Sequence, residues 1–235
     1  MQNNLDHQTF ILISPNKYLI TIVDSKNEII FEKVFKGINF KRTEKINLNI
    51  LSDFLKKNIF EIEKKFKRFI KSVHLIVDNE NIYSVNFSIK NKADIISLNT
   101  KIVNDLLLDA RTCCNDTLKD VDILHIKIDK FYIDNNYYDV LPDKKKCENL
   151  AIDLNFICLP NDLLKDIKKL LSEYQISVEK ALSYSYLKSF LNDKSKNIYE
   201  IAQKIMSGLN ENEVAITYKS PKNKGFFEKF FEFFK

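Results

Sequence analysis

The residue types that most often carry chemistry are few in this sequence and lie far apart. Two histidines stand in apolar, strand-like runs, His74 in SVHLIV and His125 in DILHIKI. Nucleophilic or general-base catalysis needs a histidine beside a serine or cysteine, with a third group that orients it. Neither histidine has such a neighbour at a familiar catalytic spacing. We interpret both as packed or hydrogen-bonded strand histidines, and we expect no enzymatic activity.

Cysteines and acidic residues give no stronger candidate for a metal or redox site. The cysteines are Cys113, Cys114, Cys147 and Cys158. Their spacing is not that of metal ligands, and an adjacent pair is a poor disulfide framework, which fits a reduced compartment. We read Cys113 and Cys114 as small buried residues ending a helix, and a redox sensor as the alternative.

One loop region is rich in acidic residues. These are Asp129, Asp134, Asp139 and Asp143. The region lacks the glycine turn and the closing glutamate of a calcium loop, so it is interpreted as a solvated loop. We expect no metal and no cofactor.

The composition is that of a globular protein and disfavours nucleic-acid binding. Hydrophobic residues make up 45% and charged residues 29% of the 235 residues. The net charge is +5, but arginine, which reads bases through bidentate contacts, is present only at Arg42, Arg68 and Arg111. The N-terminus has no basic region of a signal peptide, and no apolar run approaches the roughly 18 residues of a spanning helix. Membrane contact is therefore expected to be peripheral.

The first part of the chain predicts an α/β unit. Three runs rich in β-branched and aromatic residues, 9–14, 17–23 and 29–35, predict an antiparallel meander. Apolar residues at helical spacing then predict a helix over 48–66, with Asn47 as its N-cap. A short apolar strand, 72–77, follows and is expected to be buried on both faces.

A second module follows, with strand, helix, strand and strand in that order. The predicted strands are 85–89, 122–133 and 149–159, and the helix is centred on 102–110. The polar loop between the last two strands is either a plain solvated hairpin or a recognition loop. Under the second interpretation, the partner-binding residues are Asp134, Tyr137, Tyr138, Pro142, Lys144, Lys145 and Lys146.

The chain then returns to the α/β pattern. A helix is expected to start at Pro160, with Asn161 as its cap and Asp162 in its first turn. A strand at 176–181 and a helix at 183–191 follow. Further elements are a helix at 198–206 that ends at Gly208, a β-like run at 213–218, and a linker.

Read in order, these segments resemble FtsA, the actin-like family of cell-division proteins, most clearly over 95–193. In that family an inserted subdomain has a helix, then a strand of the form EILH, then an aromatic, an apolar residue and Asp, followed by a loop with proline. The corresponding segments here are 122–125 (DILH), 131–134 (FYID), Pro142, 150–151 (LA), 163–171 and 181–183 (ALS). The family also ends in a linker and an amphipathic membrane-targeting helix.

The resemblance implies an α/β fold with a defined division of the chain. Residues 1–84 and 160–193 would form half of an actin-like (ribonuclease H-like) domain, and 85–159 an inserted strand-helix-strand-strand subdomain. Residues 194–218 would add a helix and a strand. Residues 219–235 would form a linker and the C-terminal amphipathic helix.

The departures from the family pattern concern its nucleotide site. Actin-like ATPases have Asp-x-Gly in the first strand turn, where glycine lets backbone amides approach a phosphate. Here that place reads Ile-Ser-Pro-Asn-Lys over 13–17, and the second phosphate loop expected after Leu191 is missing. The only glycines are Gly37, Gly208 and Gly225. We expect no ATP binding. Binding of FtsZ is doubtful, because the family grips FtsZ with the half that is missing here.

The C-terminal segment GFFEKFFEFFK has six Phe among its last ten residues. On a helix, the rings fall within an arc of about 160° and the charged residues on the other side. This pattern is typical of a helix lying in a membrane surface, with lysines toward anionic headgroups. The predicted membrane-binding residues are Phe226, Phe227, Phe230, Phe231, Phe233, Phe234, Lys222, Lys224, Lys229 and Lys235. Packing on the protein's own domain and binding in a partner groove are the alternatives.

Two functions follow from these patterns. The first is a non-catalytic, peripheral-membrane scaffold of the division machinery at the inner face of the cell membrane. It would bind itself or division partners through the inserted subdomain. The second is a soluble regulatory protein whose C-terminal helix covers its own incomplete core. An ATPase with unfamiliar loops is a weaker third possibility.

Overall fold

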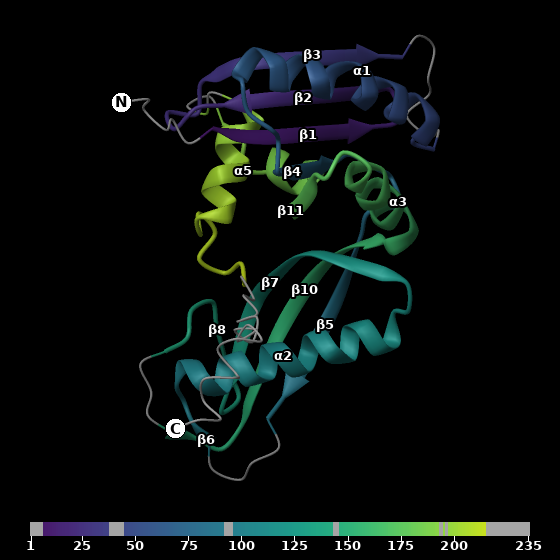
Figure 1. The fold of residues 1–235 in the computed structure, drawn as a ribbon. Coiled ribbons are helices and arrows are strands. Elements are labelled where there is room, and N and C mark those ends of the chain that lie inside the picture. Colours follow the sequence, from purple (N-terminus) through teal and green to yellow (C-terminus); the bar gives the residue numbers. More distant parts are fainter. Residues whose placement is uncertain are drawn as a thin grey trace, which may run out of the picture.

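The computed structural model describes residues 7–37, 45–91, 96–142, 146–192, 195 and 197–214. Two β-sheets lie one above the other in Figure 1, with helices packed on the first and the long helix α2 along the second. The chain passes from the first sheet to the second after β4 and returns before β11.

The first sheet has five strands in the order β11-β4-β1-β2-β3. Strands β1 (Gln8–Ser14), β2 (Lys17–Val23) and β3 (Ile29–Lys36) form an antiparallel meander, as predicted. Strands β4 (Ser72–Val77) and β11 (Ser177–Ser183) continue the sheet in parallel with β1.

Helices cover both faces of the first sheet. Helices α1 (Leu48–Phe66) and α3 (Asn161–Ser172) bury one face, where alternate residues such as Ile11, Ile13 and Leu75 point. The opposite face is covered by the short helix α4 (Tyr184–Lys188) and by α5 (Ile198–Met206). The residues of α1 follow the predicted pattern, and Asn47 caps the helix through its side-chain oxygen.

The second sheet has four strands in the order β5-β10-β7-β8. These are β5 (Tyr83–Lys90), β10 (Leu150–Pro160), β7 (Val121–Ile133) and β8 (Asn136–Tyr138). Helix α2 (Thr100–Thr117) packs on one face through an apolar stripe that includes Leu106 and Ala110. A small two-stranded sheet, β6 (Ile96–Ser97) with β9 (Lys146–Cys147), lies beside it.

The α/β fold class predicted from the sequence is confirmed. Three antiparallel strands followed by two parallel ones, joined through helices, form the mixed sheet of an actin-like (ribonuclease H-like) half domain. The strand-helix-strand-strand unit lies between β4 and β11 in the sequence and forms a sheet of its own. The predicted C-terminal helix lies outside the described residues.

Several local predictions were wrong. Asn161 is the first residue of α3 rather than its cap, because β10 runs without a break to Pro160 and leads straight into the helix. The helix expected over 183–191 is a single short turn, α4. Cys113 is exposed on α2 whereas Cys114 is buried, since adjacent helical residues point in different directions.

Candidate functional site

The turn between β1 and β2 occupies the place where the resemblance puts a phosphate loop. Pro15 and Asn16 form a tight connection between the paired residues Ser14 and Lys17. The Ser14 hydroxyl oxygen lies 3.1 Å from Asn16 Oδ1, and the Asn16 carbonyl accepts from the Gly37 N–H at 2.9 Å. Pro15 has no N–H to offer a phosphate. The geometry supports the expectation that this turn does not hold ATP, which stays a prediction.

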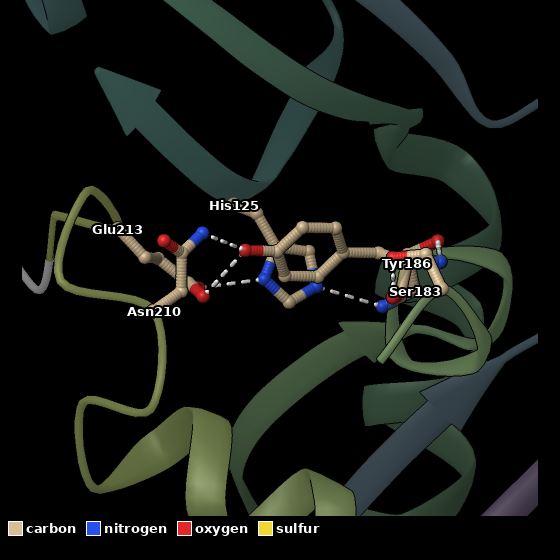
Figure 2. A network of polar contacts seen from close by, with 6 residues as sticks. His125, Ser183, Tyr186, Asn210 and Glu213 are labelled. Atoms are coloured by element: carbon tan, nitrogen blue, oxygen red, sulfur yellow. Dashed lines mark hydrogen bonds and ion pairs between the residues drawn. The ribbon is translucent and has the colours of Figure 1, made fainter. Parts of the chain in front are cut away.

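A buried polar network joins the two sheets and the segment after α5 (Figure 2). His125 projects from β7, and its Nδ1 lies 2.8 Å from Glu213 Oε1. Its Nε2 accepts the backbone N–H of Ser183, at the end of β11, at 3.0 Å. The second Glu213 oxygen accepts from the Tyr186 hydroxyl at 2.8 Å, and Asn210 Nδ2 donates to the same hydroxyl at 2.9 Å.

These contacts fix the protonation state of His125. A nitrogen that accepts from an amide carries no proton, so the imidazole is neutral and its Nδ1–H donates to Glu213. Burial lowers the pKa of His125, and the hydrogen bond to Glu213 offsets this in part. Burial also raises the pKa of Tyr186 above its ordinary value. Both imidazole nitrogens are engaged, as expected of a hydrogen-bonded strand histidine.

The second histidine is also part of the packing. The ring of His74 on β4 packs against Phe10 with ring centroids 5.2 Å apart, and its Nε2 lies 3.6 Å from Glu179 Oε2. Burial lowers the pKa of His74, and the charge of Glu179 opposes that shift. No serine or cysteine hydrogen bond to this ring is present among the described residues. The sequence interpretation of His74 as a packed strand histidine is confirmed.

A cleft of about 560 Å³ lies beside the His125 network, where β7 of the second sheet approaches β11 of the first. Its walls carry both signs of charge and several apolar side chains. The charged residues are Arg111, Asp122, Lys168, Glu179, Lys180 and Glu213. Asp122 and Lys168 approach each other across it at 3.8 Å. Because neither sign dominates, the cleft suits an uncharged chain segment better than a polyanion.

The turn between β7 and β8 contains the first of the predicted partner-binding residues. Asp134 and Asn135 both adopt positive φ, 46° and 68°, as a tight two-residue hairpin turn requires. Asp134 Oδ1 accepts the backbone N–H groups of Glu148 and Asn149 at 2.8 and 3.1 Å. Its carboxylate therefore ties the hairpin to the start of β10, a role that sequence spacing did not signal.

Beyond this turn, β8 exposes an aromatic ring. Tyr137 is 64% exposed and lies 5.0 Å from the ring of Tyr132 on β7, with Lys130 Nζ 5.7 Å from its centroid. Tyr138 and Pro142 are half-buried, and Tyr138 packs on the core of the second sheet. Of Asp134, Tyr137, Tyr138 and Pro142, only Tyr137 is thus mostly exposed to solvent.

Of the other residues predicted to bind a partner or a membrane, one lies in the described part of the chain and the others lie outside it. Lys146 is exposed on β9, opposite Ser97. Lys144, Lys145 and Asp143 lie outside the described residues, as do all ten predicted membrane-binding residues. Within the part of the chain that the structure describes, there is no cluster of three or more potential metal ligands and no helix long and apolar enough to cross a membrane.

Sequence reasoning missed the partners of His125. Glu213 and Ser183 lie far from it along the chain, and only the pairing of β4 with β11 and the path of the chain after α5 bring them together. The apolar run around His125 did signal burial, and burial of a polar ring demands hydrogen-bond partners. It could not say which residues those partners would be.

Comparison with known proteins gives likeness of structure only. No protein family model matches the chain, and no curated protein sequence matches it. Among solved structures, a PilM-PilN type IV pilus biogenesis complex aligns at 6% identity and TM-score 0.46, over 77% of this chain and 48% of that one.

Two further solved structures align at 10% and 11% identity. The cytoplasmic domain of EpsL, an inner membrane component of the Vibrio cholerae type II secretion system, gives TM-score 0.37 over 80% of this chain and 59% of its own. A Bacteroides thetaiotaomicron protein described as having an actin-like ATPase fold gives TM-score 0.31, over 78% of this chain and 55% of its own. The chain thus spans about half the length of these structures, and likenesses this weak decide nothing about function.

Proposed function

We propose that this protein is a non-catalytic scaffold that is held at a membrane surface by its Phe-rich C-terminal segment, 226–235. In this proposal the second sheet binds partner proteins or further copies of the chain. The finer form of the proposal follows the FtsA resemblance: a place in the division machinery, at the inner face of the cell membrane. FtsZ stays a doubtful partner in this proposal.

The observation that carries the proposal is the closed core of the first sheet. Its two faces are buried by α1 and α3 on one side and by α4 and α5 on the other. The alternative function needed an incomplete core for the C-terminal rings to cover. Among the described residues, both faces of this sheet are already covered, so the six Phe side chains have no vacant face of the first sheet to fill.

Burial of these rings supplies enough free energy to hold the segment at a surface. Burial of one Phe side chain is worth roughly 1.5–3 kcal/mol, so six give on the order of 10 kcal/mol before the cost of ordering the helix. An isolated helix of this length is mostly unfolded in water and forms on binding. Glu228 and Glu232 reduce the attraction to anionic lipid, so the rings, rather than net charge, must supply most of the affinity.

The second sheet supplies the contact surface in this proposal. One face is buried by α2, and the other carries exposed or half-exposed polar residues, among them Asn86, Ser88 and Asn155. On β8, at the edge of this sheet, the Tyr137 side chain is exposed, and Lys130 Nζ lies over its ring. Tyrosine is enriched at protein–protein interfaces and among the residues that contribute most to their affinity.

The test is vesicle co-sedimentation of the full chain with anionic and with neutral lipid. A triple variant, Phe227→Ser, Phe230→Ser and Phe234→Ser, is expected to lose binding by about 100-fold or more, because roughly half of the buried ring area is removed. The matched control is the pair Phe60→Ser and Phe69→Ser, which changes the two most exposed Phe side chains of the described chain, 71% and 79% exposed. We expect this control to bind as the unchanged protein does.

Thermal unfolding of the same variants separates the two functions. The tether predicts an unchanged melting temperature for the triple variant in the absence of lipid. A clearly lowered melting temperature, together with no vesicle binding by the unchanged protein, would replace the tether by a helix that packs on its own domain. Binding of ATP at millimolar concentration would contradict the non-catalytic part of the proposal.

A further inference from the structure

Two strand edges border the cleft beside His125, and neither has a partner strand on the cleft side among the described residues. Among the strands that the structure describes, β11 lies at the edge of the first sheet and pairs with β4 alone. Strand β7 pairs with β8 only over Phe131–Ile133, so its edge at 122–125 faces the cleft. Backbone N–H and C=O groups in such a place need partners, and an open edge is a template for a further strand.

One isolated antiparallel bridge already lies on the β7 edge. Glu213 forms an antiparallel bridge with Lys127. On either side of this bridge, the Ile128 N–H donates to the Asn212 carbonyl and the Val214 N–H donates to the Ile126 carbonyl, both at 2.8 Å. Because the pairing is antiparallel, the chain after Val214 is directed toward the Asp122 end of β7, which is the edge that lines the cleft.

We propose that residues 215–218, the segment AITY, extend this pairing along β7 and fill the cleft. Ile, Thr and Tyr favour extended backbone, and no glycine or proline interrupts the segment before Pro221. Four residues in a strand span about 13 Å. Five residues of β7 line the cleft, Asp122 to Ile126. The Ile126 carbonyl already accepts the Val214 N–H, so the four residues that remain for the segment are Asp122 to His125.

The lining of the cleft agrees with this occupant. Apolar side chains from both sheets and from α3, including Ile123, Val178 and Leu164, can receive the side chains of the added strand. The charged residues of the walls are mixed in sign, so an uncharged segment meets no net repulsion. The linker to the C-terminal segment would then leave the body near Asp122, beside α3. This inference concerns the free protein and does not depend on membrane binding.

The test is hydrogen–deuterium exchange of the full chain in lipid-free solution, comparing Ile216→Pro with the unchanged protein. Alternate residues of an added strand bond to its partner, and after Asn212 and Val214 the next is Ile216, whose N–H proline removes. We expect amides within 122–125 to exchange about tenfold or more faster in this variant. Asn223→Pro, beyond the proposed strand, is the matched control and should leave their exchange unchanged.

Exchange in β5, at 84–88, provides the internal reference, because that edge lies on the far side of the second sheet. Equal exchange at 122–125 in Ile216→Pro and the unchanged protein would overturn the proposal. A second outcome would also overturn the proposal: protection from exchange at 122–125 that is the same in Ile216→Pro but increases with protein concentration. That result would assign the cleft to a second copy of the chain.

Discussion

Strands β1 and β10 are interior strands of two sheets that differ in how many of their faces are covered by helices. In β1 every residue from Thr9 to Ser14 is buried, because helices cover both faces of its sheet. In β10 the residues from Leu150 to Asn155 alternate between buried and half-buried, because α2 covers only one face. Among the described residues, the first sheet is therefore a three-layer core, and the second is a two-layer unit with one polar face exposed or half-exposed to solvent.

The largest effect expected from this difference is on stability. Leu75→Ala in β4 removes a side chain that is 0% exposed, and we expect the free energy of unfolding to fall by about 2–5 kcal/mol. Ser88→Ala on the open face of the second sheet should change it by no more than about 0.5 kcal/mol. Urea denaturation measures both, and similar losses for the two variants would remove the proposed distinction.

Substitution of the residue that joins the two sheets should have a smaller effect. His125→Ala leaves Glu213 and the Ser183 N–H without their partner, and we expect a loss of about 2–3 kcal/mol. Tyr186→Phe removes one hydroxyl from the same network and should cost about 1 kcal/mol. If His125→Ala proves as mild as Tyr186→Phe, then the network does not hold the sheets together.

The smallest effect is a dependence of stability on pH. The pKa of His125 is lowered on folding, so the unfolded chain binds the proton more readily than the folded one. Its contribution is present above the ordinary histidine pKa of about 6.5 and is lost as the pH falls below it, by at most about 1.4 kcal/mol per pH unit.

Urea denaturation between pH 5 and 8 should show this decline for the unchanged protein and a shallower one for His125→Gln. Glu213 and Lys180 are the charged groups that act on His125. His74, whose pKa is also lowered, keeps its own contribution in the variant and accounts for the remaining slope. A steeper decline in the variant would contradict the assignment to His125.

Local patterns were enough to predict most elements of the fold. The spacing of apolar residues gave α1 and its cap, and β-branched runs gave the meander, because these features depend on neighbours in sequence. Short pieces such as β8 and β9 were missed, since two or three residues carry no period. The hydrogen-bond partners of His125 could not be predicted from the sequence, because they depend on packing between segments far apart in the chain.

The position of the second sheet within the chain has a consequence for how the protein folds. Strands β4 and β11 are neighbours in one parallel sheet, but β4 ends at Val77 and β11 begins at Ser177. During synthesis, the meander and α1 emerge first and make local contacts. One edge of β4 stays unpaired until the whole of the second sheet, α3 and β11 have been made. Contacts so distant in sequence form slowly. Until β11 has been made, the nascent chain exposes the edge of β4 that β11 later covers, and unpaired strand edges of this kind are prone to aggregation.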